Sequence, residues 1–370
     1  MRNLIRTVCV FIFLFGMSAP SNASDKVSVA FLNPAAQGDV FFQLLTDFMQ
    51  AAADDLGFDL DVYYGGRNHV LIDENVKALF SRDTLPQYIV GMNARGAGEL
   101  LLAQAEAAGI KTVFINQSFL GEERKSAGRP GEKYTHWLFE YLPDDTHAGY
   151  LLARILIEKA SRAGLVDADG MINIIAVSGH ETSPASLLRE EGLREALAEY
   201  PNARLRQIIH AGWKPDRAKE LSQRLLRRYP DTSVVWAASD AMGAGVAEGV
   251  RELGKHPGSN ILIGGVDWTR HAQELLGKGD FAVSVGGHFM DGAWALVMMY
   301  DAMHGIAVSR ASQSHFSSLT ARNIVEYKKH FGVSDWRKID FTKFSKYLNP
   351  TLKYYDFGLE AVLDQMETLQ

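Results

Sequence analysis

A series of glycines follows one apolar segment of this chain and could form a nucleotide-binding loop. The segment 233–250 reads SVVWAASDAMGAGVAEGV, and its apolar run ends at Ser239 and Asp240. Three glycines come next: Gly243, Gly245 and Gly249. Their spacing, GxGxxxG, differs from the dinucleotide fingerprint, and a carboxylate at position 240 would repel a pyrophosphate. We therefore expect the glycines to let a helix pack closely on a sheet, while Ser239 and Asp240 contact a ligand.

The other motifs that could support catalysis are weak. The chain has no GxSxG nucleophile elbow and no P-loop lysine motif. In GHETS (179–183), His180 lies beside Glu181, and adjacent residues do not share a helix face, so we expect a loop rather than a zinc site. His288 follows a strand and two glycines. Two interpretations stay open for it: a ligand contact, or part of a crossover segment in which glycine permits unusual dihedral angles.

Three aromatic residues stand where a strand ends or a helix begins. Phe41 and Phe42 start a helix after NPAAQGD, and we expect one of the two to belong to the core. Trp213 follows the segment RQIIHAG and precedes Lys214 and Pro215, a position too exposed for ordinary core. Exposed aromatic faces at a cleft suit the apolar faces of a sugar, whose hydroxyls bind polar side chains. These residues favour a carbohydrate-like ligand.

Alternating strand and helix patterns position these residues. The periodicity predicts strands at 26–34, 58–66, 88–93, 111–117, 172–179, 204–212, 233–239, 260–268 and 281–287. It predicts helices at 40–57, 70–80, 97–108, 144–160, 184–199, 215–228, 241–253, 269–277 and 290–304, and a polar loop at 121–133. Short connections of this kind favour right-handed βαβ crossovers. We expect an α/β fold with two successive doubly wound parallel sheets, in which ligands bind beyond the carboxyl ends of the strands.

The chain begins with a segment typical of a secretory signal peptide. Arg2 and Arg6 flank the start of an apolar run, VCVFIFLFGM, and the small residues of SNAS place cleavage after Ala23. The alternative is an N-terminal membrane anchor, but the run is short for a bilayer span. Cys9 is the only cysteine and lies in this segment, so the exported chain forms no disulfide and no thiolate metal site. This favours a bacterial periplasm.

The charge balance argues against nucleic acid or anionic lipid as a partner. The chain has 38 basic and 44 acidic residues. Loss of residues 1–23 removes two basic residues and no acid, so the net charge changes from −6 to −8. A mildly acidic exported protein is a poor candidate for binding polyanions.

Taken together, these motifs resemble those of the type I periplasmic sugar-binding proteins, the group of the ribose-binding protein and the furanosyl-autoinducer receptor. The resemblance covers roughly residues 26–330, and its motifs are moderately specific as a set. GDVFF would supply a polar residue and two stacking phenylalanines, and IGGVDW an aspartate that accepts hydrogens from sugar hydroxyls. With His288 added from the motif above, the implied ligand site consists of Asp39, Phe41, Phe42, Asn93, Asn116, Gln117, Trp213, Ser239, Asp240 and Asp267.

Two departures from the family pattern bear on the ligand. The position that usually holds a ligand-binding arginine is Leu187, and the sequence leaves open whether Arg189 or His180 takes over that role. An Asp-Arg pair of the family is Asn116-Gln117 here. Hydrogen bonds to charged groups contribute about 1.5–3 kcal/mol, against about 0.5–1.5 kcal/mol for neutral ones, so the pattern speaks against ribose itself.

The resemblance also implies two lobes joined by a hinge of three segments. We place the crossings near 140–146, 284–289 and 313–318. The first lobe would comprise 24–142 and 289–315, and the second 143–286 and 316–370. The last part, 333–370, is rich in aromatic residues; because disordered tails contain few aromatics, we expect this tail to pack on the body.

By resemblance, the protein is a monomeric periplasmic receptor without a cofactor. It would capture a sugar or a similar small polar molecule between its lobes and present it to an ABC-type permease. The alternative is delivery of the signal to a membrane sensor kinase or cyclase. A lactose-repressor type regulator shares the core fold but needs a DNA-binding segment where this chain has its signal peptide. An exported α/β enzyme would need a nucleophile or metal constellation, and no motif supplies one, so we expect neither an enzyme nor a metal or nucleic-acid binder.

Overall fold

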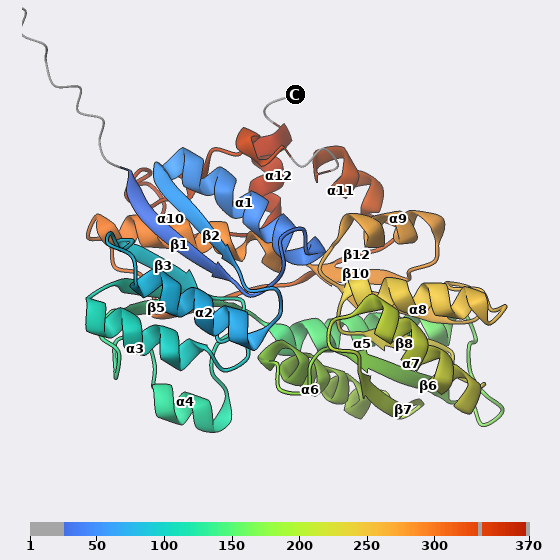
Figure 1. Ribbon diagram of the computed structural model, residues 1–370. Helices are drawn as coiled ribbons and strands as arrows, with labels where there is room; N and C mark the ends of the chain where they lie inside the picture. The colour runs from blue at the N-terminus through green and yellow to red at the C-terminus, as the bar shows by residue number, and fades with distance from the viewer. Residues whose placement is uncertain (1–25, 332–334, 368–370) are drawn as a thin grey trace, which may run out of the picture.

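The computed structural model describes residues 26–331 and 335–367, so the predicted signal peptide, 1–23, lies outside the described residues. Two lobes lie side by side, and each is built on one six-stranded sheet with helices packed against it (Figure 1). The predicted fold class, two doubly wound parallel-sheet lobes joined by a three-segment hinge, is confirmed. Within the described ranges, no helix combines the length and the apolar composition needed to cross a bilayer.

The first sheet consists of parallel strands, most of which belong to the first half of the chain. Their spatial order is β11 (Ala311–Ser314), β5 (Trp137–Pro143), β4 (Lys111–Ile115), β3 (Tyr88–Gly91), β1 (Val27–Asn33) and β2 (Phe58–Tyr64). Two pairs of helices pack against it: α1 (Val40–Leu56) with α10 (Asp291–Met303), and α2 (His69–Phe80) with α3 (Gly98–Ala108). Buried strands such as β3 carry only apolar side chains and glycine, as a sheet covered on both faces requires.

The second sheet repeats this architecture. Its spatial order is β12 (Ser317–Leu319), β10 (Val283–Gly286), β9 (Leu262–Val266), β8 (Val234–Ala237), β6 (Ile172–Ser178) and β7 (Ala203–His210). All neighbours are parallel except β12, which runs antiparallel to β10. The helices that pack around it are α5 (Asp145–Arg162) with α6 (Pro184–Glu199), α7 (Pro215–Arg228) with α8 (Asp240–Glu252), and α9 (Arg270–Lys278).

The chain passes between the two sheets at three places. It leaves the first sheet between β5 and α5, at residues 143–145. It returns between β10 and α10 through the short helix η1 (His288–Met290), and it crosses again between β11 and β12, at 314–317. Carboxyl ends of strands in both sheets consequently face the space between the lobes.

The glycine series of α8 serves packing, as predicted. A Cβ atom on Gly245 would lie 2.1 Å from the carbonyl oxygen of Pro215 in α7, and one on Gly243 would lie 2.7 Å from the ring of Phe281. Only glycine permits this close approach of α8 to its neighbours, because a Cβ atom there would clash with backbone. A nucleotide-binding role for the series receives no support from this geometry.

The region 121–133, expected to be a polar loop, and the residues that follow it differ from the sequence expectation. It contains α4 (Gly121–Ala127), followed by strand β5, which the periodicity did not indicate. The reason is a buried ion pair: Arg124 of α4 contacts Glu140 of β5 at 3.0 Å, and Ser118 donates a hydrogen bond to the same carboxylate. A charged residue in the middle of a strand hides its apolar pattern.

The aromatic tail packs on the body, but not on the lobe to which the sequence assigned it. Helix α11 (Ile324–Phe331) contacts α9 of the second lobe, whereas η2 (Trp336–Lys338) and η3 (Phe341–Phe344) contact α1 of the first lobe. The rings of Trp336 and Phe341 lie edge-on to Phe48 of α1, with centroids 5.2 and 5.3 Å apart. Placing all of 316–370 in the second lobe is therefore wrong for 336–344, because these aromatics cover an apolar face of α1. The last helix is α12 (Leu359–Glu367).

Candidate functional site

A cavity of about 210 Å³ lies between the lobes. It is smaller than the ~300–1,000 Å³ of pockets for drug-sized ligands, so it suits a smaller molecule. Its walls come from the start of α1 and the segments after β2 and β4 in the first lobe, and from the starts of α6, α7 and α8 in the second. The lining residues are Gly38, Asp39, Val40, Phe41, Phe42, Arg67, Asn116, Gln117, Ala185, Arg189, Trp213, Pro215, Ser239, Ala241, Asp267, Thr269 and His288.

The first-lobe wall is organised by the start of α1. Asp39 caps this helix by accepting a hydrogen bond from the Phe42 backbone N–H at 3.3 Å, and its other oxygen pairs with Arg67 at 2.6 Å. Phe41 and Phe42 contact each other edge to face with ring centroids 5.1 Å apart, and both line the cavity. The ring of Phe41 also stacks on the ring of His288, with centroids 4.5 Å apart. This wall therefore contacts the hinge segment that contains His288.

The second-lobe wall is dominated by Trp213. Its indole lies directly over Gly179, where an added Cβ atom would come within 2.2 Å of the ring. The glycine at the end of β6 therefore makes the space that this side chain occupies. Ser239 and Thr269 line the same wall, and each caps a helix, α8 and α9 respectively, through its side-chain oxygen.

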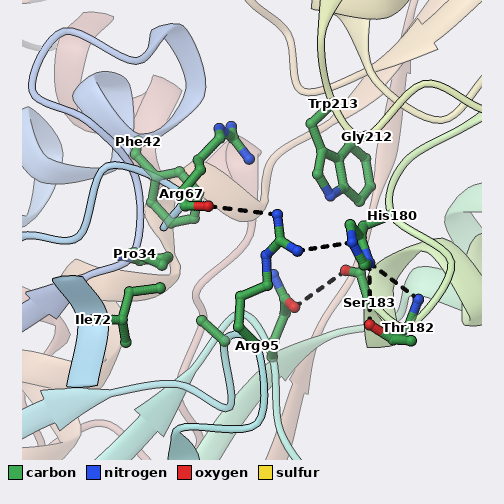
Figure 2. A pocket seen from close by; sticks show the side chains of 12 residues that line it. Pro34, Phe42, Arg67, Ile72, Arg95, His180, Thr182, Ser183, Gly212 and Trp213 are labelled. Carbon is green, nitrogen blue, oxygen red and sulfur yellow. Dashed lines mark hydrogen bonds between the residues drawn. The ribbon is translucent and has the colours of Figure 1, made fainter. Parts of the chain in front are cut away.

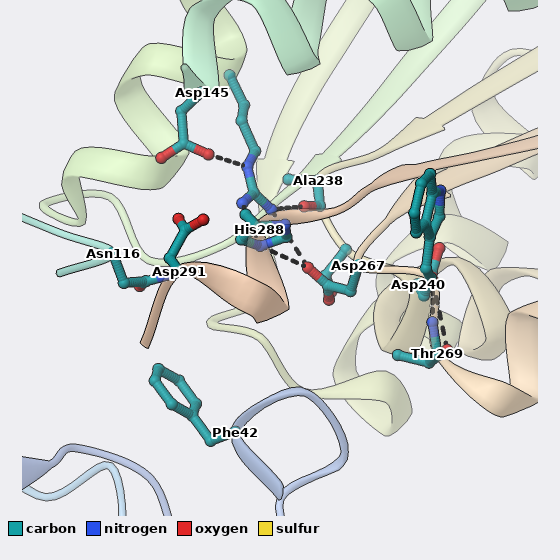
Figure 3. Close-up of polar contacts among 12 residues, drawn as sticks. Phe42, Asn116, Asp145, Ala238, Asp240, Asp267, Thr269, His288 and Asp291 are labelled. Carbon is teal, nitrogen blue, oxygen red and sulfur yellow. Dashed lines mark hydrogen bonds and ion pairs between the residues drawn. The ribbon is translucent and has the colours of Figure 1, made fainter. Parts of the chain in front are cut away.

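Arg189 is the buried cation of the site. Its side chain is 4% exposed, and its Nε donates to Asp145 at 2.7 Å while Nη1 donates to the Ala238 carbonyl oxygen at 2.7 Å. The same guanidinium lies 3.7 Å from Asp267 and 3.4 Å from the Nε2 atom of His288 (Figure 3). Of the two residues that the sequence left open for the family arginine, Arg189 lines this cavity.

The two alternatives to Arg189 lie elsewhere. Leu187, at the position expected for the arginine, is 44% exposed on the outer side of α6. His180 lines a neighbouring cavity, described below, and not this one. Because Leu187 and Arg189 are two residues apart on one helix, their side chains project in different directions, and only the second faces the lobe interface.

Burial controls the protonation of the two titratable groups beside Arg189. It raises the pKa of Asp267 well above its usual range, although the Arg189 guanidinium acts in the opposite direction. Burial, with a smaller contribution from Arg189, lowers the pKa of His288 well below its usual range, so the imidazole is neutral. The described residues supply no hydrogen-bond donor to the Asp267 carboxyl group; the nearest side-chain nitrogens are those of Arg189 at 3.7 Å and of the neutral His288 at 3.5 Å. Its oxygens are therefore available to a ligand.

Backbone strain is concentrated around this cavity. Among the described residues, the non-glycine residues with φ between 56° and 129° are Arg67, Arg95, Asn116, Trp213, Asp267 and Trp268. Five of them line this cavity or the adjoining one, and Trp268 directly follows Asp267. Such conformations cost about 1–3 kcal/mol each and cluster at binding and active sites. The residues with strained backbone therefore lie at the same cavities as the aromatic and charged lining side chains.

A second, smaller cavity of about 60 Å³ adjoins the first, and we call it the mouth of the cleft. It shares Phe42, Arg67, Gln117 and Trp213 with the larger one. Two hydrogen bonds cross between the lobes here: Arg95 Nη1 contacts His180 Nε2 at 2.7 Å, and Ser183 donates to Gln117 at 3.3 Å (Figure 2). The remaining residues that line it are Pro34, Ile72, Ala94, Arg95, His180, Thr182, Ser183 and Gly212.

The structure places two of the predicted site residues outside both cavities. Asn93 is buried, accepts a hydrogen bond from the backbone N–H of Gly98 at the start of α3 at 3.1 Å, and donates to Glu123 at 2.7 Å. Asp240 is buried and accepts hydrogen bonds from Ser284 and from the backbone N–H of Thr269. Their polar groups are saturated by the protein, which is why a position at a strand end did not make them part of the lining.

Arg67 is a lining residue that the sequence interpretation missed. It follows Gly65 and Gly66 at the end of β2, and its φ of 56° places it in the left-handed region. A strand that ends in two glycines and an arginine was a usable signal, because the carboxyl end of β2 lies at the edge of the sheet where ligands bind. Thr269 was also missed, although it directly follows the Asp267-Trp268 pair.

The buried carboxyl group of Asp291, at the start of α10, allows a pH prediction. Its Oδ2 accepts a hydrogen bond from Ser314 at 2.9 Å, and its Oδ1 has no partner among the described residues. Burial raises its pKa well above the usual range. A raised folded-state pKa gives stability that is present below the ordinary value, ~3.9, and is lost as pH rises through the folded-state value. Asp291→Asn should therefore raise the melting temperature clearly at pH 7.5 and much less at pH 4. Equal shifts at both pH values in calorimetry would show that the buried charge is not the cause.

Metal binding has no candidate here: the described residues contain no group of three or more His, Cys, Asp or Glu side chains placed to hold an ion.

Comparisons with known proteins agree with this geometry. Residues 29–306 match the model of the periplasmic binding protein domain. The chain is 34% identical to a periplasmic sugar-binding protein from Pseudomonas fluorescens of known crystal structure, with a TM-score of 0.82, over 91% of this chain and 99% of that one. It is 24% identical to the ribose import binding protein of Escherichia coli (strain K12), over 77% of this chain and 86% of that protein. It is 26% identical to the D-allose-binding periplasmic protein of the same organism, over 54% of this chain and 60% of that protein.

These relatives are binding proteins rather than enzymes, and the match covers both lobes and the hinge between them. The chain belongs to the periplasmic binding protein family.

Proposed function

We propose that this protein captures a sugar or a similar small polar molecule in the interlobe cavity and presents it to an ABC-type permease. The observation that carries the proposal is the free Asp267 carboxylate opposite aromatic faces in a buried cavity. Relatives named for D-allose and ribose support the class of ligand. The protein would bind this ligand without transforming it, as a monomer in the periplasm after removal of residues 1–23.

Each lining group has a role in this proposal. The faces of Trp213, Phe41 and Phe42 would pack on the apolar faces of the sugar ring. Asp267 would accept hydrogens from hydroxyl groups, and Arg189 would donate to a ring or hydroxyl oxygen. The polar termini of Asp39, Asn116, Gln117 and Ser239 would bind the remaining hydroxyls, and His288 would contact the ring from the hinge. Asn93 and Asp240 would act only by holding the backbone of the site.

Closure of the lobes would complete the site. The crossings at 143–145, 286–291 and 314–317 are short, so small dihedral changes there rotate one sheet relative to the other. In this proposal the first lobe comprises 24–142 and 289–315, the second begins at 143, and residues 336–344 of the tail move with the first. The contacts Arg95–His180 and Ser183–Gln117 would form only in the closed state.

A thermal-shift screen of the mature protein tests the ligand class. Pentoses, hexoses, polyols and furanones are the compounds to compare. A ligand at 100 times its Kd stabilises the folded state by about 2.7 kcal/mol, which gives a measurable rise of the melting temperature. A mature protein that responds to no member of these classes would contradict the proposal.

Trp213→Ala should weaken binding of a compound found in that screen by at least about tenfold, because the variant loses both the stacking face and its buried area. Trp213→Phe is the matched control and should stay within about threefold, since it keeps an aromatic face. Titration calorimetry measures both. Equal affinity of the alanine variant and the wild type would remove Trp213 from the site.

A further inference from the structure

The mouth of the cleft is positively charged in a protein that is negatively charged as a whole. The net charge of the chain is −6, yet the residues that line the mouth cavity include Arg67 and Arg95 and no aspartate or glutamate. A cleft lined by charge of one sign concentrates its field and attracts ligands of the opposite sign. The local excess of positive charge therefore calls for an explanation.

Arg95 carries most of this excess. The Arg67 guanidinium is compensated by Asp39 at 2.6 Å, whereas Arg95 forms no ion pair with a carboxylate anywhere in the described ranges. Arg95 Nη1 contacts His180 Nε2 at 2.7 Å, and Nη2 donates to the backbone oxygen of Arg67 at 3.4 Å (Figure 2). Both acceptors are neutral, so the charge of the guanidinium is not balanced by them.

His180 stays neutral beside this guanidinium. Burial and the Arg95 charge lower the pKa of the imidazole below its usual range, against a smaller opposite effect of Glu181. The Nε2 atom of His180 faces Arg95, and its Nδ1 atom lies 3.1 Å from the Thr182 hydroxyl and 3.3 Å from the Thr182 backbone nitrogen. Glu181 is 76% exposed, contacts His210 at 3.8 Å and forms no ion pair with Arg95 among the described residues.

The backbone conformation of the two arginines also supports a binding role for this cavity. Arg67 and Arg95 both have φ of 56°, a left-handed conformation that costs a non-glycine residue about 1–3 kcal/mol. Two arginines from different strand ends are thus held at the same cavity in strained conformations. Hydroxyl and amide groups of Thr182, Ser183 and Gln117 complete a ring of neutral polar groups around them.

We infer that the ligand of the interlobe cavity is an acidic sugar, whose carboxylate or phosphate group lies at the mouth beside Arg67 and Arg95. This inference rests on the proposed function. The two cavities share Phe42, Arg67, Gln117 and Trp213, so one molecule can place its ring inside and its anionic substituent at the mouth. The planar donor fork of an arginine matches either anion, and charge-assisted hydrogen bonds are about twice as strong as neutral ones.

Matched neutral and acidic sugars test the inference. Titration calorimetry compares glucose with glucuronate and glucose 6-phosphate, and ribose with ribose 5-phosphate, on the wild type, Arg95→Gln and Arg82→Gln. Arg82 is the control because it carries the same charge on the same lobe but pairs with Asp61, away from both cavities. Comparing glucuronate with the two sugar phosphates shows whether the anionic group of the ligand is a carboxylate or a phosphate.

The expected result is that at least one acidic sugar binds the wild type ten times or more tightly than its neutral parent. Arg95→Gln should remove this difference, so that the acidic sugar binds no more tightly than its neutral parent, and Arg82→Gln should preserve the difference. Raising the salt concentration should weaken only the acidic ligand. If neutral sugars bind as tightly as their acidic counterparts, the inference is wrong and the proposed function stands. If no sugar of either kind binds, both fail.

Discussion

Replacing Arg189 with methionine should lower the free energy of unfolding by about 3–5 kcal/mol and abolish ligand binding. The side chain of Arg189 is 4% exposed, and its Nε pairs at 2.7 Å with Asp145, whose side chain is 3% exposed. Removing one member of a buried ion pair leaves the other charge in a medium that solvates it poorly, which is the costly way to break such a pair. Denaturant unfolding of the mature variant measures the effect, and a midpoint equal to that of the wild type would contradict the account of this network.

A double variant separates the stabilising role of Arg189 from its role at the ligand. Arg189→Met combined with Asp145→Leu removes both charges and fills similar volume with apolar groups. We expect this protein to recover most of the lost stability and still to bind no ligand, because Arg189 lines the cavity and Asp145 does not. If the double variant binds like the wild type, the Arg189 guanidinium does not contact the ligand.

Asp267→Asn should weaken ligand binding by about 100-fold or more. The carboxyl group accepts no hydrogen bond from the described residues, so ligand hydroxyls can bind both of its oxygens, and each buried group left unpaired costs about 1–3 kcal/mol. The amide of asparagine has one acceptor oxygen and one donor nitrogen in place of two acceptor oxygens. The ligand hydroxyl that faced the lost oxygen would have to rotate and accept a hydrogen bond instead. Titration calorimetry with the strongest sugar of the screen measures the loss.

Asp240→Asn is the matched control for this prediction. Asp240 is also a buried aspartate that follows an apolar strand, but its carboxylate is saturated by Ser284 and Thr269 and lies outside the cavity lining. The control variant should lose stability and keep its affinity within about threefold. If the affinity of Asp267→Asn also stayed within about threefold of the wild type, the ligand would lie elsewhere.

Much of the fold was predictable because most elements are amphipathic or wholly apolar. The helix expected at 40–57 is α1, Val40–Leu56, and the strand expected at 172–179 is β6, Ile172–Ser178. Strand β5 was not indicated, because its Glu140 is buried through a partner, Arg124, that lies outside the strand. Residues 336–344 were assigned to the wrong lobe for a similar reason: sequence periodicity does not say which apolar surface an aromatic cluster covers.

The sequence predicted which strand ends surround the candidate site. It predicted less well which side chains line the cavity. The rule that ligands bind at the carboxyl ends of strands, together with the family resemblance, selected Asp39, Trp213 and Asp267, and all three line one cavity. The same rule selected Asn93 and Asp240, whose side chains turn inward to hold the backbone. Whether a polar group faces the cavity depends on local partners that the rule does not contain.

Arg189 shows a different limit. It lies within helix α6, and its position in the sequence does not distinguish it from the exposed charges around it. Its burial is explained by Asp145, 44 residues earlier, and by the close packing of α5 on α6. A charge whose partner comes from another helix becomes recognisable as part of a site only when the two helices are placed together.

A crystal structure of the mature protein with the sugar that stabilises it most tests the central claim most directly. The account predicts electron density for the sugar between the lobes, with one face of the ring on Trp213 and hydroxyl groups within hydrogen-bond distance of Asp267 and Arg189. Density for the sugar that contacts one lobe only, or that lies outside the cavity lined by these three residues, would contradict it.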